Sequence, residues 1–491
     1  MGRDVAAVAV SREDRRRYRD KVRRCLDVLA RMLRESQFEF DRPHIGLEIE
    51  LNLVDEQGDP LMRNAEVLDA IADPAWATEL GQFNLEINVP PRELGSAGEM
   101  EQEVRQDLDK DDRAAQSVGG RLVMIGILPT LRESDIHEGT LSHNERYKLL
   151  NEQVFEARGE ALHIVIDGTE RLDVRADSIT PEAACTSAQF HLQVSPDEFA
   201  ATWNAAQAIA GIQVAVAANS PFLFGRELWQ ESRITLFEQA TDTRPVELKA
   251  QGVRPRVWFG ESWITSVFDL FEENTRYFPA LLPICSEEDP QAVLDSGEIP
   301  ALDELTLHNG TVYRWNRPVY AVVDGRPHLR VENRVLPAGP TVADTIANGA
   351  FYYGLVRYLA DEERPLWTRM EFAAAEENLH RAARLGIQAP LLWPGADEAR
   401  ASDLVRRRLL PMAQEGLDRQ GVDAQRRDRL LGIIDDRCRT GQTGAAWQIA
   451  TVRGIEESYN VDRHDALRLM IRSYIEHMHT NEPVHTWPIG P

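Results

Sequence analysis

The chain has 491 residues and carries 55 Lys and Arg against 80 Asp and Glu, which gives a formal net charge of −25. Hydrophobic residues make up 43% of it, enough to form a sizeable core and too many for a disordered polymer. Such an acidic chain repels phosphate backbones and anionic lipid headgroups, so we expect small-molecule partners, with no nucleic acid and no membrane surface among them. At about 150 residues per domain, the length favours about three units or one large catalytic domain.

Absent motifs exclude several enzyme classes. Only four of the basic residues are lysines, and none of them stands in a GxxxxGK[ST] phosphate-binding loop. The sequence also has no GxGxxG, HExxH or GxSxG, which removes the simple dinucleotide enzymes, zinc proteases and serine hydrolases.

The cysteines and the N-terminal sequence predict a cytoplasmic protein. No two of the four cysteines form a CxxC pair, so neither a disulfide framework nor a structural zinc site is indicated. The start, MGRDVAAVAV, lacks the long apolar region of a signal peptide. The most apolar stretch, residues 205–224, is interrupted by Gln207, Gln213 and Asn219, so we predict no membrane span.

The first part of the chain predicts a helix followed by a mixed α+β region. Residues 11–36 place Val22, Cys25 and Leu29 at helical spacing among arginines and glutamates, so we assign residues 1–40 to an amphipathic helix packed on the main domain. From about residue 43 to about 336, strand-like segments are separated by helices expected at 98–118, 143–158, 197–217 and 262–274. Because strands and helices do not alternate regularly, the pattern favours an antiparallel or mixed α+β sheet over a doubly wound fold.

After Pro340 the pattern is almost wholly helical. Helices are predicted at 342–361, 370–385, 398–420, 424–438, 443–458 and 462–478. The clearest break is PLLWPGADEARASD at 390–403, which holds two prolines and a glycine. We therefore place the main domain at residues 41–390 and a helical C-terminal region at 391–491, whose role as a lid, a dimer surface or a binding module stays open.

Four predicted strands share one design. Each alternates apolar residues with polar ones, and because side chains of a strand alternate between faces, each polar row leaves the sheet opposite the apolar row. The polar rows include Glu48 and Glu50 in HIGLEIELNLV (44–54), Glu86 in FNLEINV (83–89), His191 and Gln193 in AQFHLQVS (188–195), and Arg330, Glu332 and Arg334 in HLRVENRVL (328–336).

Any one such strand is more often the solvated face of a one-sided sheet. Solvated faces, however, usually favour Lys, Thr and Ser, whereas these strands offer Glu, His, Asn and Gln, which are ligands and hydrogen-bonding groups. Four strands of this kind together favour a functional face.

The residue types on this face indicate a site for metal and nucleotide. Residues two apart on a strand lie roughly 7 Å apart, so Glu48 and Glu50 can reach neighbouring ions. Hard carboxylate oxygens favour Mg²⁺ or Mn²⁺ over zinc. Two such ions could bridge the phosphates of ATP, while Arg330 and Arg334 neutralise a transferring phosphoryl group.

These segments resemble a known family. GLEIE (46–50), FNLEINVPP (83–91), ANSPF (218–222), RVENR (330–334) and ENLHRAARLGIQA (377–389) resemble, in this order and spacing, the group-2 glutamate-cysteine ligases and their carboxylate-amine ligase relatives. The resemblance runs from about residue 40 to about 390. It implies a glutamine-synthetase-like catalytic domain, in which an antiparallel sheet forms a funnel, flanked by helices, for Mg²⁺, ATP and an amino-acid carboxylate.

The resemblance also implies roles by motif position. The metal ligands would be Glu48, Glu50, Glu86 and Glu332; the residues near nucleotide would be His191, Gln193, Asn219 and Ser220; and the residues near phosphate or substrate would be Arg330, Arg334 and Arg233. Many relatives have a histidine or an asparagine at the position of Gln193, so the donor site can differ. Arg233 is equally well an ordinary helix-surface arginine, and Arg314 and Asn316 either face the site or pack beside Tyr313 and Trp315.

The implied activity is an ATP-dependent carboxylate-amine ligase that forms an amide through an acyl phosphate, with the γ-carboxylate of glutamate as the expected donor. Two alternatives remain at this point: a catalytically weak nucleotide-binding regulatory protein of the same fold, and a metal-dependent hydrolase, which the arginines near Glu332 disfavour. The sequence leaves open the amine, with cysteine as the family's best-known choice, and a homo-oligomeric state.

Overall fold

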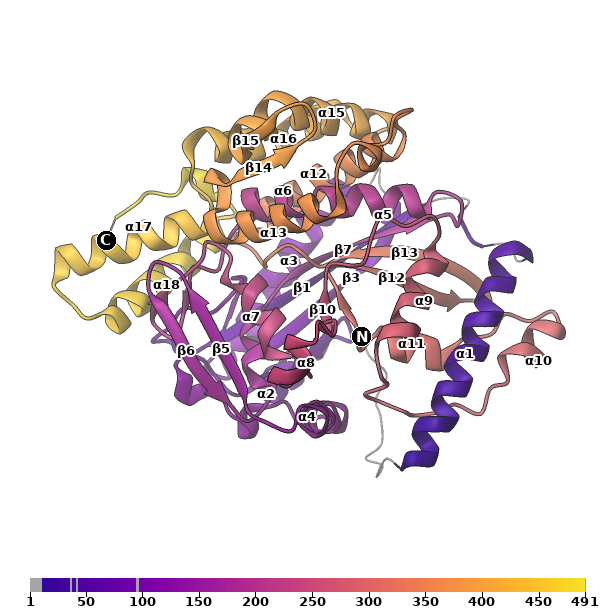
Figure 1. Ribbon diagram of the computed structural model, residues 1–491. Helices are drawn as coiled ribbons and strands as arrows, with labels where there is room; N and C mark the ends of the chain where they lie inside the picture. The colour runs from indigo at the N-terminus through magenta and orange to yellow at the C-terminus, as the bar shows by residue number, and fades with distance from the viewer. Residues whose placement is uncertain (1–10, 36–37, 41–42, 94–96, 491) are drawn as a thin grey trace.

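The computed structural model describes residues 11–35, 38–40, 43–93 and 97–490. Its centre is a seven-stranded sheet with the order β12-β13-β7-β1-β3-β2, in which β4 also pairs with β1 (Figure 1). All pairings in this sheet are antiparallel, which confirms the predicted α+β class. The strands are β1 (His44–Val54), β2 (Trp76–Thr78), β3 (Asn84–Glu93), β4 (Arg121–Val123), β7 (Ala188–Val194), β12 (Asn316–Val323) and β13 (Arg326–Asn333).

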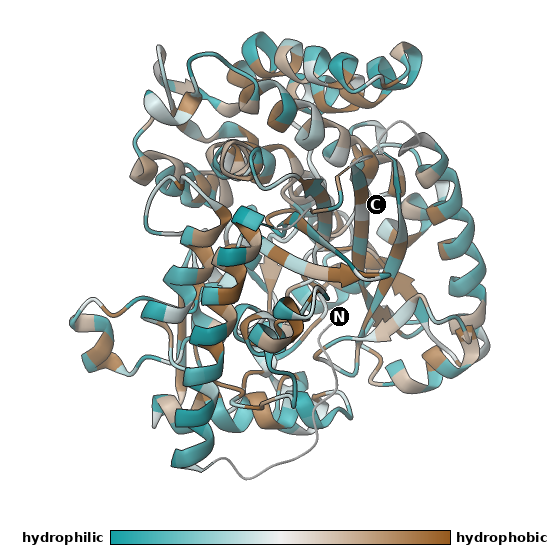
Figure 2. Cartoon of the chain, turned by 90° about the vertical axis from the view of Figure 1, so that its right-hand side faces the viewer, coloured by the Kyte–Doolittle hydropathy of each residue, from teal (hydrophilic) through white to brown (hydrophobic). Residues whose placement is uncertain are grey.

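Helices cover the apolar face of this sheet. Ile45, Leu47 and Ile49 on β1 are buried. The helices α3 (Ala97–Ser117), α5 (Phe199–Ala208) and α12 (Val342–Ala360) contact other strands of the sheet. The Tyr353 hydroxyl of α12 donates to the carbonyl of His191 at 3.0 Å, which fixes the helix on β7. Figure 2 shows hydrophobic residues concentrated in the interior and hydrophilic ones on the outer faces of the surrounding helices. Full burial of each such aliphatic side chain stabilises the fold by about 2 kcal/mol.

Shorter elements border the polar face. They are α2 (Asn64–Ile71), α4 (Glu145–Arg158), the hairpin of β5 (Leu162–Asp167) and β6 (Arg171–Ala176), the one-turn helix η4 (Thr180–Ala184), β8 (Phe222–Leu223), β9 (Arg226–Glu227), α7 (Ser232–Ala240), α8 (Val246–Ala250), β10 (Val257–Trp258) and β11 (Tyr313–Arg314). Beyond β12 lie α9 (Val267–Tyr277), α10 (Pro290–Asp295) and α11 (Asp303–Asn309).

The C-terminal helices follow the predicted pattern closely. They are α13 (Phe372–Leu385), α14 (Ala401–Leu404), α15 (Leu410–Arg419), α16 (Ala424–Thr440), α17 (Gly444–Tyr459) and α18 (Arg463–Thr480). The predicted break at 390–403 holds a small hairpin, β14 (Pro390–Trp393) and β15 (Asp397–Arg400), so the helix expected from 398 begins at 401. The helix expected at 197–217 is divided at Ile209 into α5 and α6 (Ala210–Ala217).

Buried contacts join the C-terminal helices to the sheet domain. Arg437 of α16 forms an ion pair of 2.9 Å with Asp344 of α12, and both side chains are almost fully buried. The Tyr474 hydroxyl of α18 donates to the carbonyl of Met124 at 2.7 Å. At Gly211, an added Cβ would lie 2.5 Å from the backbone of Asn378, so glycine permits the close approach of α6 and α13. The division of the chain at residue 390 stays a prediction.

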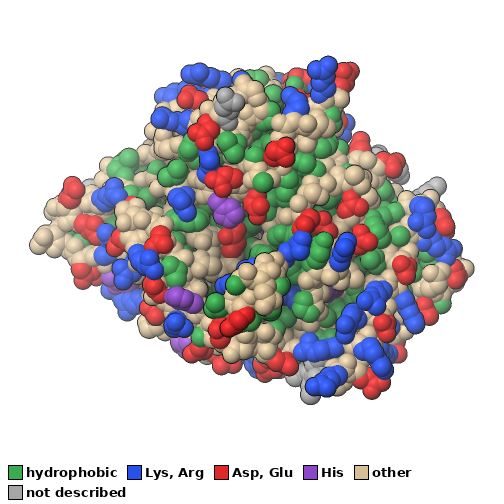
Figure 3. Space-filling model, viewed as in Figure 1, with side chains coloured by type: hydrophobic (Ala, Val, Ile, Leu, Met, Phe, Trp, Pro, Cys, Tyr) green, Lys and Arg blue, Asp and Glu red, His purple; other side chains and the backbone are tan. Residues whose placement is uncertain are grey.

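The N-terminal helix α1 (Arg12–Glu35) is amphipathic, as expected, and packs against α9, α10 and α11. Its buried Tyr18 donates to the carbonyl of Glu304 at 2.8 Å. Its outer face exposes Arg12, Arg16, Arg19 and Arg23, and Figure 3 shows basic side chains gathered over this helix. The overall charge of −25 therefore conceals a local basic surface. Within the described residues, every helix is too short or too polar to span a bilayer.

Candidate active site

The sheet register brings the polar rows of four strands together. Glu50 of β1 lies opposite Glu86 of β3, and Glu48 of β1 lies opposite Gln189 of β7. On the other side of β7, His191 lies opposite Glu332 of β13. Because these strands are neighbours, carboxylates that are up to 284 residues apart in the chain share one face.

One group on this face consists of Glu48, His191 and Glu332, which we call the paired cluster. Its potential ligand atoms lie within 4.8 Å of one another. The Nε2 of His191 is 3.1 Å from Oε1 of Glu48. Burial raises the pKa of Glu48, but the hydrogen bond and charge of His191 outweigh burial and lower this pKa to about 2. The carboxylate of Glu48 is therefore ionised at neutral pH.

Two arginines hold Glu332, which is fully buried. Arg317 of β12 binds both carboxylate oxygens, at 2.7 and 2.8 Å, and Arg334, directly after β13, donates to Oε1 at 2.6 Å. Burial alone would raise the pKa of Glu332, but these two guanidinium groups lower it well below its usual value. Arg334 also donates to Oε1 of Gln189.

A second group consists of Glu50, Glu79 and Glu86, which we call the open cluster. Its ligand atoms also lie within 4.8 Å of one another. Glu50 accepts from the backbone N–H and the hydroxyl of Ser187, at 2.6 and 3.0 Å, and from Nε2 of Gln189 at 2.6 Å. No arginine, lysine or histidine among the described residues forms an ion pair with these three carboxylates.

The open cluster is protonated more readily than isolated carboxylates. Burial, followed by the charges of Glu48 and Glu50, raises the pKa of Glu86 to about 7. Burial and the charge of Glu86 raise the pKa of Glu79 well above its usual value. Burial also raises the pKa of Glu50, although Arg334 opposes the shift. Like charges held at this separation in a low-dielectric site disfavour ionisation.

These donor sets fit Mg²⁺ or Mn²⁺. Five carboxylates and one imidazole form two groups on one face, and carboxylate oxygens are the ligands that both hard cations take in proteins. A divalent cation would remove the repulsion that raises the pKa values in the open cluster. The predicted ligands Glu48, Glu50, Glu86 and Glu332 are thus brought together, with Glu79 and His191 beside them.

All three carboxylates of the open cluster, together with Glu48 of the paired cluster, line a cleft of about 690 Å³. Its floor is the polar face of the sheet, and its walls come from α4, η4, α7 and β11. The guanidinium of Arg146 on α4 lines it and makes no ion pair or hydrogen bond with any described residue. The walls also carry Tyr147, Glu182, Phe237 and Tyr313.

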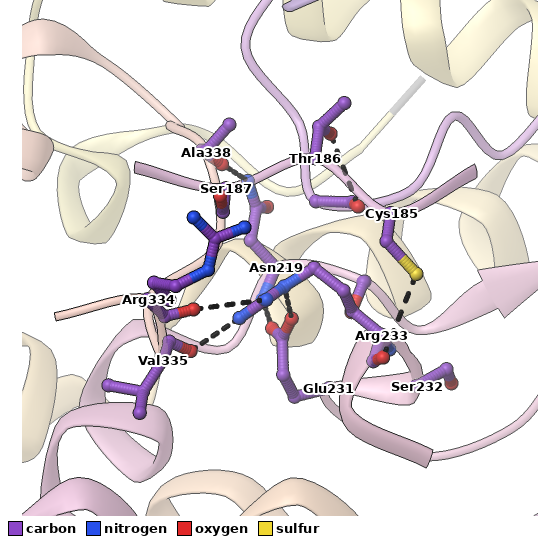
Figure 4. A network of polar contacts seen from close by, with 12 residues as sticks. Cys185, Thr186, Ser187, Asn219, Glu231, Ser232, Arg233, Arg334, Val335 and Ala338 are labelled. Atoms are coloured by element: carbon purple, nitrogen blue, oxygen red, sulfur yellow. Dashed lines mark hydrogen bonds and ion pairs between the residues drawn. The ribbon is translucent and has the colours of Figure 1, made fainter. Parts of the chain in front are cut away.

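Arg233 of α7 supports the end of the cleft that carries Arg334. Its Nε donates to Glu231 at 3.0 Å, and its other nitrogens donate to the carbonyls of Arg334 and Val335 (Figure 4). Arg233 is 3% exposed, so it is not the ordinary surface arginine of the alternative interpretation. Its contacts fix the backbone that carries Arg334, and it also lines the cleft.

Asn219 and Ser220 lie behind the cleft and do not line it. The Nδ2 of Asn219 donates to the carbonyl of Ala338 at 2.8 Å and to the Tyr474 hydroxyl at 2.9 Å. The Ser220 hydroxyl accepts from the backbone N–H of Arg233 at 3.3 Å. Both residues are fully buried, and their position supports Arg233 and the C-terminal helices, whereas the sequence predicted contact with nucleotide.

Gln193 and Arg330 lie farther along the polar face. Gln193 accepts from the backbone N–H of His44 at 3.1 Å and donates to the carbonyl of Glu39 at 2.8 Å, away from the cleft. Arg330 donates to Nδ1 of His191 at 3.0 Å. The imidazole then presents Nε2 to Glu48, so Arg330 orients a member of the paired cluster.

Sequence reasoning missed Glu79, Arg146, Glu182 and Arg317. Glu79 and Glu182 lie outside the alternating strands, so no periodicity marks them. Tyr313, Trp315 and Arg317 line the cleft, so the residues of this segment alternate, but the row that faces the cleft is the one opposite to that considered from the sequence. Arg314 and Asn316 point into the core instead, where Arg314 binds Glu273 at 2.7 Å and Asn316 donates to Gln207 at 2.8 Å.

Comparisons with known proteins agree with this geometry. The chain matches the model of glutamate-cysteine ligase family 2 over residues 44–468. A solved glutamate-cysteine ligase from Francisella tularensis in complex with AMP has 13% identity and a TM-score of 0.55, and the match covers 90% of each chain. This likeness supports the fold.

Two further structures show weaker likenesses. A bifunctional glutathione synthetase from Pasteurella multocida has 12% identity and a TM-score of 0.46, with 93% of this chain and 55% of that chain covered. A chain from the complex of the prokaryotic ubiquitin-like protein Pup with its ligase PafA has 11% identity and a TM-score of 0.41, and the match covers 89% of this chain and 72% of that chain. No curated protein sequence matches significantly. The extent of the family match, together with the antiparallel sheet and its acidic face, shows that the chain belongs to glutamate-cysteine ligase family 2.

Proposed function

We propose that this protein is an ATP-dependent carboxylate-amine ligase that uses Mg²⁺ or Mn²⁺. The observation that carries the proposal is the pair of carboxylate groups on one sheet face with Arg334 between them, since Arg334 contacts Glu332 and Gln189, and Gln189 contacts Glu50. Bound cations would bring the phosphates of ATP and a substrate carboxylate together. The family match supports the same reaction class.

The chain's own residues contribute charge neutralisation and positioning. Arg334 can donate a bidentate fork to a transferring phosphoryl group, and Arg233 fixes its backbone. The paired cluster and the open cluster would hold the metal ions. The cleft keeps water away from the acyl phosphate, which is already an activated acyl donor and needs no side-chain nucleophile.

We propose glutamate as the donor, with its γ-carboxylate phosphorylated and its α-carboxylate bound by Arg146. Arg146 is a cleft-lining guanidinium without an internal partner, and such a group is suited to a substrate carboxylate. A neutral Arg146→Met variant should therefore raise the KM for glutamate by about tenfold or more.

The decisive experiment measures ADP release with glutamate and a panel of amines, including cysteine, in Mg²⁺ and in chelator. A ligase releases ADP and forms the amide only when carboxylate, amine and metal are all present. ATP-induced thermal stabilisation without turnover on any pair would favour a nucleotide-binding regulatory protein. Hydrolysis that needs metal but no ATP would favour a hydrolase.

A further inference from the structure

Glu182 lines the cleft, and the proposed roles of the arginines and metal ligands do not involve it. It lies on η4, and its carboxylate lines the cleft. Its carboxylate makes no ion pair or hydrogen bond with any described residue, in contrast to the carboxylate of Glu332, which binds two arginines. An unpartnered carboxylate in a partly enclosed cleft is stable only if a cation or a proton joins it.

Aromatic side chains line the same cleft as Glu182. Tyr147 on α4, Tyr313 on β11 and Phe237 on α7 line the same cleft, and the rings of Phe237 and Tyr313 meet edge to face with centroids 5.4 Å apart. Burial, followed by the charge of Glu182, raises the pKa of Tyr313 to about 12. A carboxylate beside aromatic rings favours an alkylammonium group, because the rings attract a cation and accommodate its carbon atoms.

The cleft that Glu182 shares with the proposed reaction is the second argument. Glu50, Glu79, Glu86 and Arg334 line this cleft as well. The acyl phosphate of the proposed reaction would form between the open cluster and Arg334. A cation held by Glu182 would therefore lie in the same cleft as the acyl carbon.

We infer that Glu182 binds the protonated amino group of the amine acceptor and receives the proton that this group must lose before attack. The inference rests on the proposed function. The freed amine nitrogen forms the bond to the acyl carbon, while the bond from that carbon to the phosphate oxygen breaks and phosphate leaves with the electron pair. The remaining excess proton on nitrogen passes to the released phosphate.

The electrostatics of Glu182 agree with this role. Burial and the charge of Glu50 raise its pKa to about 8, while Arg334 opposes the shift. A carboxyl group of this kind can take a proton near neutral pH, where an ordinary glutamate cannot.

The test compares two nucleophiles in the full-length protein with ATP, Mg²⁺ and glutamate. Primary alkylamines and amino acids are ammonium ions at neutral pH, whereas hydroxylamine is neutral there and attacks an acyl phosphate to give a hydroxamate. Glu182→Gln should lower kcat/KM for the ammonium acceptors by about a hundredfold, because it removes a charged hydrogen bond. Hydroxamate formation and the KM for glutamate should stay within about threefold. Glu145→Gln, an exposed change on α4, is the control and should alter neither rate.

The outcomes distinguish a failure of the role inferred for Glu182 from a failure of the proposed ligase activity. A loss confined to ammonium acceptors supports the inference. An equal loss with both nucleophiles, or a raised KM for glutamate, overturns it and leaves the ligase assignment intact. Should Glu182→Gln be poorly folded, Glu182→Asp retains the charge, and it must then keep more activity with ammonium acceptors than Glu182→Ala. A wild-type protein that forms neither amide nor hydroxamate contradicts the proposed function and this inference together.

Discussion

The paired cluster and the open cluster lie on one face of one sheet, yet their electrostatics are opposite. Glu332 is held by Arg317 and Arg334, and Glu48 by His191, so the carboxylates of the paired cluster keep their charge. Glu50, Glu79 and Glu86 have mainly neutral donors around them. Neighbouring strands therefore build one acidic group that is neutralised by the protein and one that is not.

This difference indicates that the two clusters contribute differently to cation binding and to stability. The paired cluster has its counter-charges in the fold, so it is ordered without a ligand. The open cluster stores repulsion that a divalent cation relieves, so the free energy of cation binding should come mostly from this side. Substitutions that remove one negative charge should then have opposite effects on stability in the two clusters.

The largest expected effect is on turnover at the open cluster. Glu79→Gln removes one of three carboxylates that can bind a cation, so metal-dependent ADP release should fall by about a hundredfold or more. In chelator its melting temperature should equal or exceed that of the wild type, because repulsion with Glu86 is relieved. Phosphate-release assays and melting curves measure the two quantities. Glu66→Gln, an exposed change on α2, should affect neither, and wild-type turnover in Glu79→Gln would remove Glu79 from the cation site.

A second comparison concerns stability alone. Glu332→Gln leaves Arg317 and Arg334 without the buried carboxylate between them, which should lower the free energy of unfolding by about 3 kcal/mol. Glu86→Gln, made in the open cluster, should leave that free energy equal or higher in chelator. Urea unfolding of both variants in chelator at neutral pH gives the two values. Changes of the same sign in both would show that the clusters do not differ as the structure indicates.

The sequence predicted the sheet face and most of the carboxylates because alternation along a strand determines the side on which a residue lies. Glu48, Glu50 and Glu86 line the cleft, and Glu332 lies behind them in the paired cluster, as the polar rows of the strands predicted for one shared face. Glu79 could not be found this way, since it follows β2 in a segment without alternation. The division of the face into a paired and an open cluster also depends on Arg317, which lies in the same alternating row as Tyr313 and Trp315, and both rows of this segment carry polar residues, so alternation alone does not show which row faces the cleft.

The roles expected for Asn219 and Ser220 illustrate a different limit. ANSPF is a motif of the resembling family, but a motif does not show whether its polar groups face a ligand or the protein. Here the amide of Asn219 binds Ala338, Tyr474 and Gln448, and these contacts join residues far apart in the chain. Local sequence contains no information on such partners, so only the tertiary structure distinguishes support from contact.

The smallest expected effect is a difference in pH dependence between the clusters. The pKa of Glu86 is raised from 4.5 to about 7, so its contribution to stability is fully present below about pH 4.5 and is lost as the pH rises through about 7. The pKa of Glu48 is lowered to about 2, so its contribution is present above about pH 4.5 and is lost as the pH falls through about 2.

In chelator, the melting temperature of the wild type should therefore decrease between about pH 5 and pH 8, by a few degrees. His380, whose hydrogen bond to Glu238 outweighs burial and raises its pKa to about 9, contributes a decrease of the same sign. The difference between wild type and Glu86→Gln isolates the open cluster, because His380 is present in both. This difference should grow with pH in chelator and shrink in excess Mg²⁺, since a bound cation keeps Glu86 deprotonated at all these values. A difference that is independent of both pH and Mg²⁺ would mean that neighbouring carboxylates do not repel Glu86 and that Glu86 does not bind the cation.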